Sequence, residues 1–260
     1  MTTRSEVTTA QHDGYVTLTL NAPERRNALT IPMVQELTAA IGSAAQDPVN
    51  HAVVLTGAGT VFCSGADRNM ISELTELAPE AIATRVYGHF QGLVRAIVDA
   101  EVPIVAAVNG AALGAGCDLA LACDCRLVTP GARFEETWIR LGLLPGMGAM
   151  SLLAPLVGLG TARNMLYRAE SIDGTRAYEL GLAEAVTEAE SLEELVGQWI
   201  TPLTTAPRSA LSSLKRGTRR ATLRFLEDDL DFVSSRQGMR IASDDVRSRL
   251  ASLVTSGVGR

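Results

Sequence analysis

The sequence is poor in features that mark several protein classes. Aromatic residues make up only 4% of its 260 residues, so alanine, leucine and valine must supply most of the core packing. Positive charge is not in excess, because the net charge is −6, and this argues against a nucleic-acid partner, which needs clustered basic residues. Hydrophobic residues reach 47% and charged residues 20%, a balance typical of a folded chain.

Metal-ligand patterns are also missing. Four cysteines and three histidines occur, and three of the cysteines lie close together as Cys117, Cys123 and Cys125. A structural zinc site needs C-x₂-C pairs or a nearby histidine, and neither is present. We therefore expect no metal site and interpret the cysteines as buried free thiols in a reducing cytoplasm.

No uninterrupted hydrophobic run is long enough to suggest a membrane span. Residues 102–123 and 141–162 come closest, but prolines and glycines interrupt both stretches. The first residues of the chain are polar, unlike a secretory signal. We therefore expect a cytoplasmic protein without a membrane partner.

The sequence does contain an alternation of β-rich and helical segments. Strands are predicted at residues 15–20, 52–56, 103–108, 126–128, 132–134 and 183–186, and helices at 30–45, 79–100, 117–123, 161–167 and 172–180. This order predicts an α/β fold with parallel crossover connections. From residue 191 onward the pattern is only helical, so we expect a core over residues 1–195 and a C-terminal helical region over 196–260 that acts as a lid or an oligomerisation arm.

Two Gly-rich turns follow two of the predicted strands. The first contains Ser64, Gly65, Ala66 and Asp67, and the second spans Gly110–Asp118 and opens a helix. Small residues let a ligand approach the backbone, and the first N–H groups of a helix lack internal partners and lie at the positive end of its dipole. Each turn is therefore either a tight bend or a site for an oxyanion. Neither has the spacing of a dinucleotide or P-loop motif.

Together and in this order, the two turns resemble the crotonase (enoyl-CoA hydratase/isomerase) superfamily. The similarity runs through PERRNAL, VVLTGAGTVFCSGAD and PIVAAVNGAALGAGCDLALACD and covers roughly residues 12–190. It implies a ββα spiral core, C-terminal helices that join trimers or dimers of trimers, and a coenzyme A thioester as substrate with no permanently bound cofactor. It also implies that the N–H groups of Ala66 and Ala115 hold the thioester enolate. The implied coenzyme A contacts are Arg25, Arg26, Ala28, Ser64, Ala66, Asp67, Arg68, Leu113 and Gly114.

The acid–base positions depart from the family pattern. Hydratases of this kind use two glutamates, whose positions hold Asp118 and Trp138 here. Asp118 shares a helix face with Ala115 and is either a base or a carboxylate that only favours the helix dipole. Trp138 cannot transfer protons in this role and is either a wall of the acyl pocket or core packing. Glu135 and Glu136 lie nearby, and Glu136 is the candidate to be recruited as a second acid.

The remaining carboxylates restrict the reaction. Some related isomerases and dehalogenases carry an aspartate in the next turn, where this sequence has Gly146. A one-base reaction, such as a 1,3-proton shift through Asp118, is therefore favoured over two-acid hydration. Two alternatives remain: C–C cleavage or decarboxylation of an acyl-CoA, in which the enolate is the product, and a non-catalytic acyl-CoA-binding protein.

Overall fold

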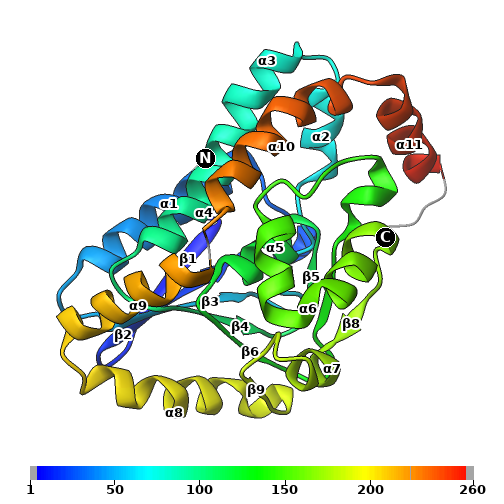
Figure 1. Ribbon diagram of the computed structural model, residues 1–260. Coiled ribbons are helices and arrows are strands. Elements are labelled where there is room, and N and C mark those ends of the chain that lie inside the picture. Colours follow the sequence, from blue (N-terminus) through cyan, green and yellow to red (C-terminus); the bar gives the residue numbers. More distant parts are fainter. Residues whose placement is uncertain (1–4, 223, 256–260) are drawn as a thin grey trace.

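A six-stranded sheet lies at the centre of the computed structural model, which describes residues 5–222 and 224–255 (Figure 1). The strand order is β1-β2-β3-β4-β6-β9, in which β1 is antiparallel to β2 and the other neighbours are parallel. The strands are β1 Val7–Gln11, β2 Tyr15–Leu20, β3 Ala52–Gly57, β4 Ile104–Val108, β6 Cys125–Val128 and β9 Ala185–Val186. The predicted α/β class with parallel crossovers is confirmed.

A second, three-stranded sheet carries one of the Gly-rich turns. Its central strand β7 (Arg133–Glu135) pairs in parallel with β5 (Ala111–Leu113) and antiparallel with β8 (Ile172–Asp173). Helix α5 begins at Ala115, two residues after β5 ends. The small sheet therefore determines where the N-terminus of α5 lies.

Helices cover both faces of the central sheet. On one face, α8 packs Leu192, Val196 and Ile200 against Val54 and Leu127, and the larger core fills the other face. The α-helices are α1 Ile31–Gln46, α2 Arg68–Leu74, α3 Pro79–Ile82, α4 Gly88–Asp99, α5 Ala115–Ala122, α6 Ala149–Arg168, α7 Gly174–Glu179, α8 Leu192–Thr204, α9 Arg208–Thr222, α10 Leu226–Ile241 and α11 Asp244–Thr255. Shorter 3-10 helices span Pro23–Arg25, Thr137–Leu141 and Ala189–Ser191.

Several predicted elements differ from the structure in extent. The helix expected over residues 79–100 is α3 and α4 joined by a π-helical turn, Ala83–Tyr87. The helix expected at 161–167 belongs to α6, which starts twelve residues earlier and is interrupted at Gly158. Strand β1 was not predicted, because only Val7 of its five residues is buried and the polar–apolar alternation is absent.

The C-terminal helices fold back over the core. Helix α10 packs against α3, the π-helical turn and α6, and α11 contacts the 3-10 helix Thr137–Leu141 (Figure 1). The predicted boundary between residues 195 and 196 falls inside α8, and the division into two parts stays a prediction. The role of the C-terminal helices in joining subunits also stays a prediction. Each helix within residues 5–222 and 224–255 is too short or too polar to cross a membrane.

The four cysteines are free thiols. Cys63, Cys117 and Cys123 are buried as expected, whereas Cys125 is partly exposed. Burial raises the pKa of Cys63 and of Cys125 to about 12, so both thiols are protonated at neutral pH.

Candidate functional site

The two Gly-rich turns lie against each other in the structure. The Cys63 N–H donates to the Ala111 carbonyl at 3.0 Å, and the Leu113 N–H donates to the Cys63 carbonyl at 3.0 Å. A Cβ atom on Gly116 would lie 2.2 Å from the Cys63 carbonyl oxygen, so this approach requires a glycine. The backbone pairing brings together two segments that are about fifty residues apart in the chain.

Gly65 brings Ala66 next to the start of α5. Its φ of +99° lies in the region that favours glycine, and a Cβ atom there would lie 2.6 Å from the Leu113 carbonyl oxygen and 3.5 Å from the Ala115 nitrogen. The Leu29 N–H donates to the Gly65 carbonyl, and the Asp67 N–H donates to the Leu29 carbonyl. Among the described residues, neither the Ala66 N–H nor the Ala115 N–H has an acceptor. Two donors therefore remain available at the junction of the turns.

The residues implied to contact coenzyme A lie along one edge of these turns. The Ser64 N–H donates to the Arg26 carbonyl at 3.0 Å, which places residues 25–29 beside residues 63–67. Arg25 is ion-paired with Glu6 at 2.6 Å, and Asp67 accepts the Met70 N–H as the cap of α2. The structure brings together Arg25, Arg26, Ala28, Ser64, Ala66, Asp67, Arg68, Leu113 and Gly114, and their contacts with coenzyme A stay predictions.

Arg68 also lines a groove between α2 and α11. The groove has a volume of about 390 Å³ and includes Arg247 of α11. Arg247 donates to the Thr75 carbonyl at 2.7 Å and to Asp244 at 3.2 Å. Sequence reasoning missed Arg247, because only the folded tail places it beside residue 68.

Asn27 is a second residue that the sequence did not reveal. It is buried with a φ of 54°, and its amide accepts the Ala22 N–H and donates to the carbonyls of Ala58 and Val61 at 3.0 and 2.7 Å. Asparagine tolerates the left-handed region better than most residues. The hydrogen bonds of Asn27 therefore hold the loop that carries Arg25 and Arg26 in place.

Asp118 is buried and hydrogen-bonded through both carboxylate oxygens. Oδ2 accepts the Trp138 indole N–H at 3.0 Å, and Oδ1 accepts the Ala149 N–H at the start of α6 at 2.9 Å. Burial raises the pKa of Asp118 to about 7, although the two hydrogen bonds favour the charged form and lower it. The two residues at the hydratase glutamate positions therefore contact each other.

Glu136 and Glu135 have different surroundings. Glu136 is 1% exposed, and neither of its carboxyl oxygens has a hydrogen-bond partner of good geometry among the described residues. Burial and then the nearby charge of Asp118 raise the Glu136 pKa well above its ordinary value, which favours the neutral form of this carboxyl. Glu135 is ion-paired with Arg140 at 2.5 Å. Of the two glutamates, Glu136 is thus the one near Asp118.

A small apolar cavity with a volume of about 20 Å³ opens beside Ala66. Trp138 is part of its wall, whereas Asp118 and Glu136 are not. Since the Trp138 indole also binds Asp118, it separates the carboxylate from the cavity. The cavity is lined by Ala66, Met70, Ile71, Leu74, Val86, Tyr87, Phe90, Trp138, Leu143, Gly146, Met147 and Ile241.

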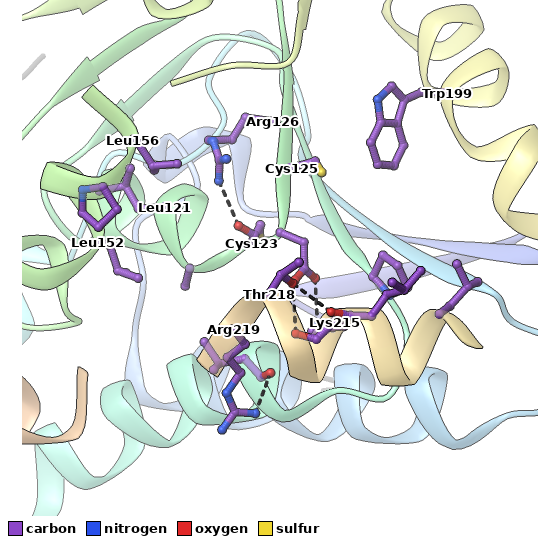
Figure 2. A pocket seen from close by; sticks show the side chains of 17 residues that line it. Leu121, Cys123, Cys125, Arg126, Leu152, Leu156, Trp199, Lys215, Thr218 and Arg219 are labelled. Carbon is purple, nitrogen blue, oxygen red and sulfur yellow. Dashed lines mark hydrogen bonds and ion pairs between the residues drawn. The ribbon is translucent and has the colours of Figure 1, made fainter. Parts of the chain in front are cut away.

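A larger cavity of about 420 Å³ lies away from the turns, between α8, α9, α6 and the end of α5 (Figure 2). In Figure 2, Trp199 comes from α8, and Lys215 and Thr218 come from α9. Lys215 is ion-paired with Asp124 at 2.7 Å and donates hydrogen bonds to the carbonyls of Ile97 and Val102. Neither Ala66 nor Ala115 lines this cavity, so it is not continuous with the predicted thioester site.

Comparison with known proteins agrees with this geometry. Residues 10–254 match the family model described as enoyl-CoA hydratase/isomerase. The chain is 41% identical to "Probable enoyl-CoA hydratase EchA14" of Mycobacterium tuberculosis over 79% of this chain and 77% of that protein. It is 31% identical to the 1,2-epoxyphenylacetyl-CoA isomerase of Escherichia coli, with 93% and 92% covered.

Solved structures show the same fold. An enoyl-CoA hydratase from Mycobacterium avium subsp. paratuberculosis K-10 superimposes with a TM-score of 0.86 at 30% identity, and the match covers 96% of both chains. The mixed α/β core with its helical C-terminal region is therefore the crotonase fold. With the two paired turns, the family match and these similarities, the chain belongs to the enoyl-CoA hydratase/isomerase family of the crotonase superfamily.

Proposed function

We propose that this protein binds an acyl-CoA thioester and holds its carbonyl oxygen between the N–H groups of Ala66 and Ala115. The observation that carries this proposal is the convergence of two turns with two amide donors that have no acceptor within residues 5–222 and 224–255. Removal of an α-proton places negative charge on the thioester oxygen, and one preorganised donor of this kind contributes about 3–4 kcal/mol in comparable sites. The relatives named above act on CoA thioesters by name, which supports the substrate class.

The reaction is a one-base proton transfer in which Asp118 removes and returns a proton. A pKa of about 7 suits a general base at neutral pH. Hydration through two acids is disfavoured, because Trp138 holds one position and Glu136 does not line the cavity. Since the indole separates Asp118 from the cavity, this reaction requires Trp138 to move when the acyl group enters.

A second candidate function is acyl-CoA binding without catalysis. The specific observation in its favour is that both Asp118 oxygens are already hydrogen-bonded and that Trp138 stands between Asp118 and the cavity. In that case the two amides bind the thioester carbonyl, and no proton leaves the α-carbon.

Deuterium wash-in distinguishes these functions. We expect the protein to exchange the α-protons of saturated acyl-CoA thioesters in D₂O, with at least a roughly tenfold loss in Asp118→Asn. Asp173→Asn is a matched control, because Asp173 is an exposed helix cap and asparagine caps equally well. Crotonyl-CoA hydration is measured in parallel and is expected to be slow.

Each other outcome has a distinct meaning. Tight binding without exchange favours the non-catalytic function, and equal exchange in Asp118→Asn removes Asp118 from the mechanism. Rapid hydration contradicts the one-base reaction. Acyl-CoA affinity is measured for each variant, because asparagine must direct its NH₂ group at one of the two N–H donors that bind Asp118.

A further inference from the structure

Tyr87 brings a hydroxyl group to the apolar cavity beside Ala66. It is the last residue of the π-helical turn Ala83–Tyr87, and turns of this kind occur frequently at functional sites. Its side chain is 4% exposed and lines the cavity together with Trp138. The Trp138 indole N–H is already bound to Asp118, and the remaining lining side chains are aliphatic, thioether or phenyl groups. The phenol is therefore the polar side-chain group that a ligand in this cavity meets.

The position of the phenol depends on Gly146. A Cβ atom on Gly146 would lie 2.9 Å from Cε1 of Tyr87, 3.6 Å from its hydroxyl oxygen and 3.4 Å from the Trp138 ring. The Tyr87 ring thus occupies the space into which a side chain at position 146 would extend. Because residue 146 has no side chain, the Tyr87 phenol supplies the polar group on this wall of the cavity.

Gln237 of α10 lies beside the Tyr87 hydroxyl group. It is fully buried, its Oε1 accepts the Leu144 N–H at 3.0 Å, and its Nε2 donates to the Leu144 carbonyl at 2.7 Å. These two bonds determine which side of the amide carries the NH₂ group. The Gln237 side chain also lies next to the Tyr87 phenol, and since its oxygen is engaged by Leu144, the NH₂ group is the part available to the phenol. A phenol that accepts from this NH₂ group keeps its own proton for another acceptor.

We propose that Tyr87 donates a hydrogen bond to an oxygen atom on the acyl chain beyond the thioester carbonyl, so that the site selects short acyl-CoA thioesters that carry a keto or hydroxyl group. This inference rests on the proposed function. A buried donor without an acceptor is costly, and an oxygenated acyl group supplies that acceptor whereas a hydrocarbon chain does not. The cavity volume of about 20 Å³ is close to that of a single water site, so an acyl chain enters only when the cavity widens, and a short chain requires the smaller opening.

Calorimetric binding of butanoyl-CoA and 3-oxobutanoyl-CoA tests the inference. We expect the unaltered protein to bind the 3-oxo ligand about tenfold more tightly, and Tyr87→Phe to reduce this preference to about twofold or less by weakening only the 3-oxo ligand. Phenylalanine keeps the ring that packs on Gly146, and unchanged butanoyl-CoA affinity shows that the fold is intact. Tyr167→Phe is the control, because Tyr167 is exposed on α6.

The outcomes separate this inference from the proposed function. If Tyr87→Phe weakens both ligands equally or neither of them, Tyr87 is not the donor, while the thioester-binding proposal stands. If the unaltered protein binds both ligands with equal affinity, the selection for an oxygenated chain is wrong. If it binds neither ligand, the proposed function itself is overturned.

Discussion

The two turns of the site present backbone N–H groups that find no acceptor among the described residues, whereas the acidic side chains beside them are buried and either paired or raised in pKa. Glycines at positions 65 and 116 allow the close approach that creates the backbone part. The acid–base part depends instead on which partners surround Asp118 and Glu136. A backbone donor survives any side-chain replacement that preserves the chain path, but a carboxyl group changes its chemistry with its neighbours. The backbone part can thus be retained while the acid–base part diverges.

The largest effect is expected from removing one backbone donor. Ala115→Pro deletes the N–H at the first position of α5, where proline is well tolerated in helices. Gly114 precedes it, and glycine accepts the backbone restriction that proline imposes on its predecessor. We expect α-proton exchange to fall roughly 100-fold or more, as for loss of one oxyanion-hole donor. Exchange rate and thermal unfolding are measured together.

Ala115→Gly is the matched control, because it keeps the N–H and changes only the side chain. It is expected to retain full exchange and to lose about 0.5–1 kcal/mol of stability at most. Should Ala115→Pro fold normally and exchange at the unaltered rate, the Ala115 N–H does not stabilise the enolate.

An intermediate effect is expected from Trp138→Phe. The variant keeps a ring beside the cavity but removes the donor to Asp118 Oδ2, so the pKa of Asp118 rises further above its value of about 7. Because the folded pKa already exceeds the unfolded one, the added loss of stability appears as pH rises through the folded pKa. We expect a loss of about 1.5–3 kcal/mol at pH 8 and a smaller loss at pH 5 in urea denaturation.

The control for this change is Trp199→Phe, which alters a tryptophan on α8 away from Asp118. An equal loss of stability at both pH values in Trp138→Phe would mean that the indole acts only through packing. In the exchange assay, the midpoint of the pH profile is expected to move upward in Trp138→Phe and to stay unchanged in Trp199→Phe.

Local patterns allowed the sequence to predict the backbone part of the site. The turns at Gly65 and Gly114 follow apolar strands and consist of small residues, so their positions depend on a few neighbouring residues. Spacing along α5 placed Asp118 in the first turn of the helix that begins at Ala115. The antiparallel edge strand β1 was not predicted, because one buried residue produces no periodicity.

Long-range contacts account for what could not be predicted. The bond between Trp138 and Asp118 joins residues 20 positions apart and depends on how the 3-10 helix Thr137–Leu141 packs against α5. Tyr87 was missed because a regular helix with Val86 on its buried face turns the next residue away, whereas the π-helical turn buries both. Gln237 reaches this site only because α10 folds back over the core.

The smallest effect is expected from Glu136→Gln, which replaces a buried carboxyl group of raised pKa with a neutral amide. The folded pKa of Glu136 is raised well above its ordinary value, so only the unfolded chain releases this proton as pH rises above about 4.5. In the unaltered protein, Glu136 therefore makes the free energy of unfolding fall as pH rises. The variant lacks this contribution to the pH dependence of stability. We expect the stability difference between the two proteins to change in favour of the variant as pH rises from 5 to 6, by at most about 1.4 kcal/mol, the limit for one proton per pH unit.

Urea denaturation across this pH range measures that slope directly. Asp118 contributes its own pH dependence to both proteins, since its folded pKa of about 7 also exceeds the unfolded value. The comparison is made between pH 5 and pH 6, below that folded pKa, where Asp118 is mostly protonated and acts least on Glu136. Glu179→Gln is the control, because Glu179 is exposed on α7 and its ion pair is with the neighbouring Arg176. Parallel pH curves for Glu136→Gln and the unaltered protein would mean that Glu136 ionises normally in the folded state. Glu136 would then be a second charge beside Asp118, and the acid–base part of the site would have to be reconsidered with two carboxylates.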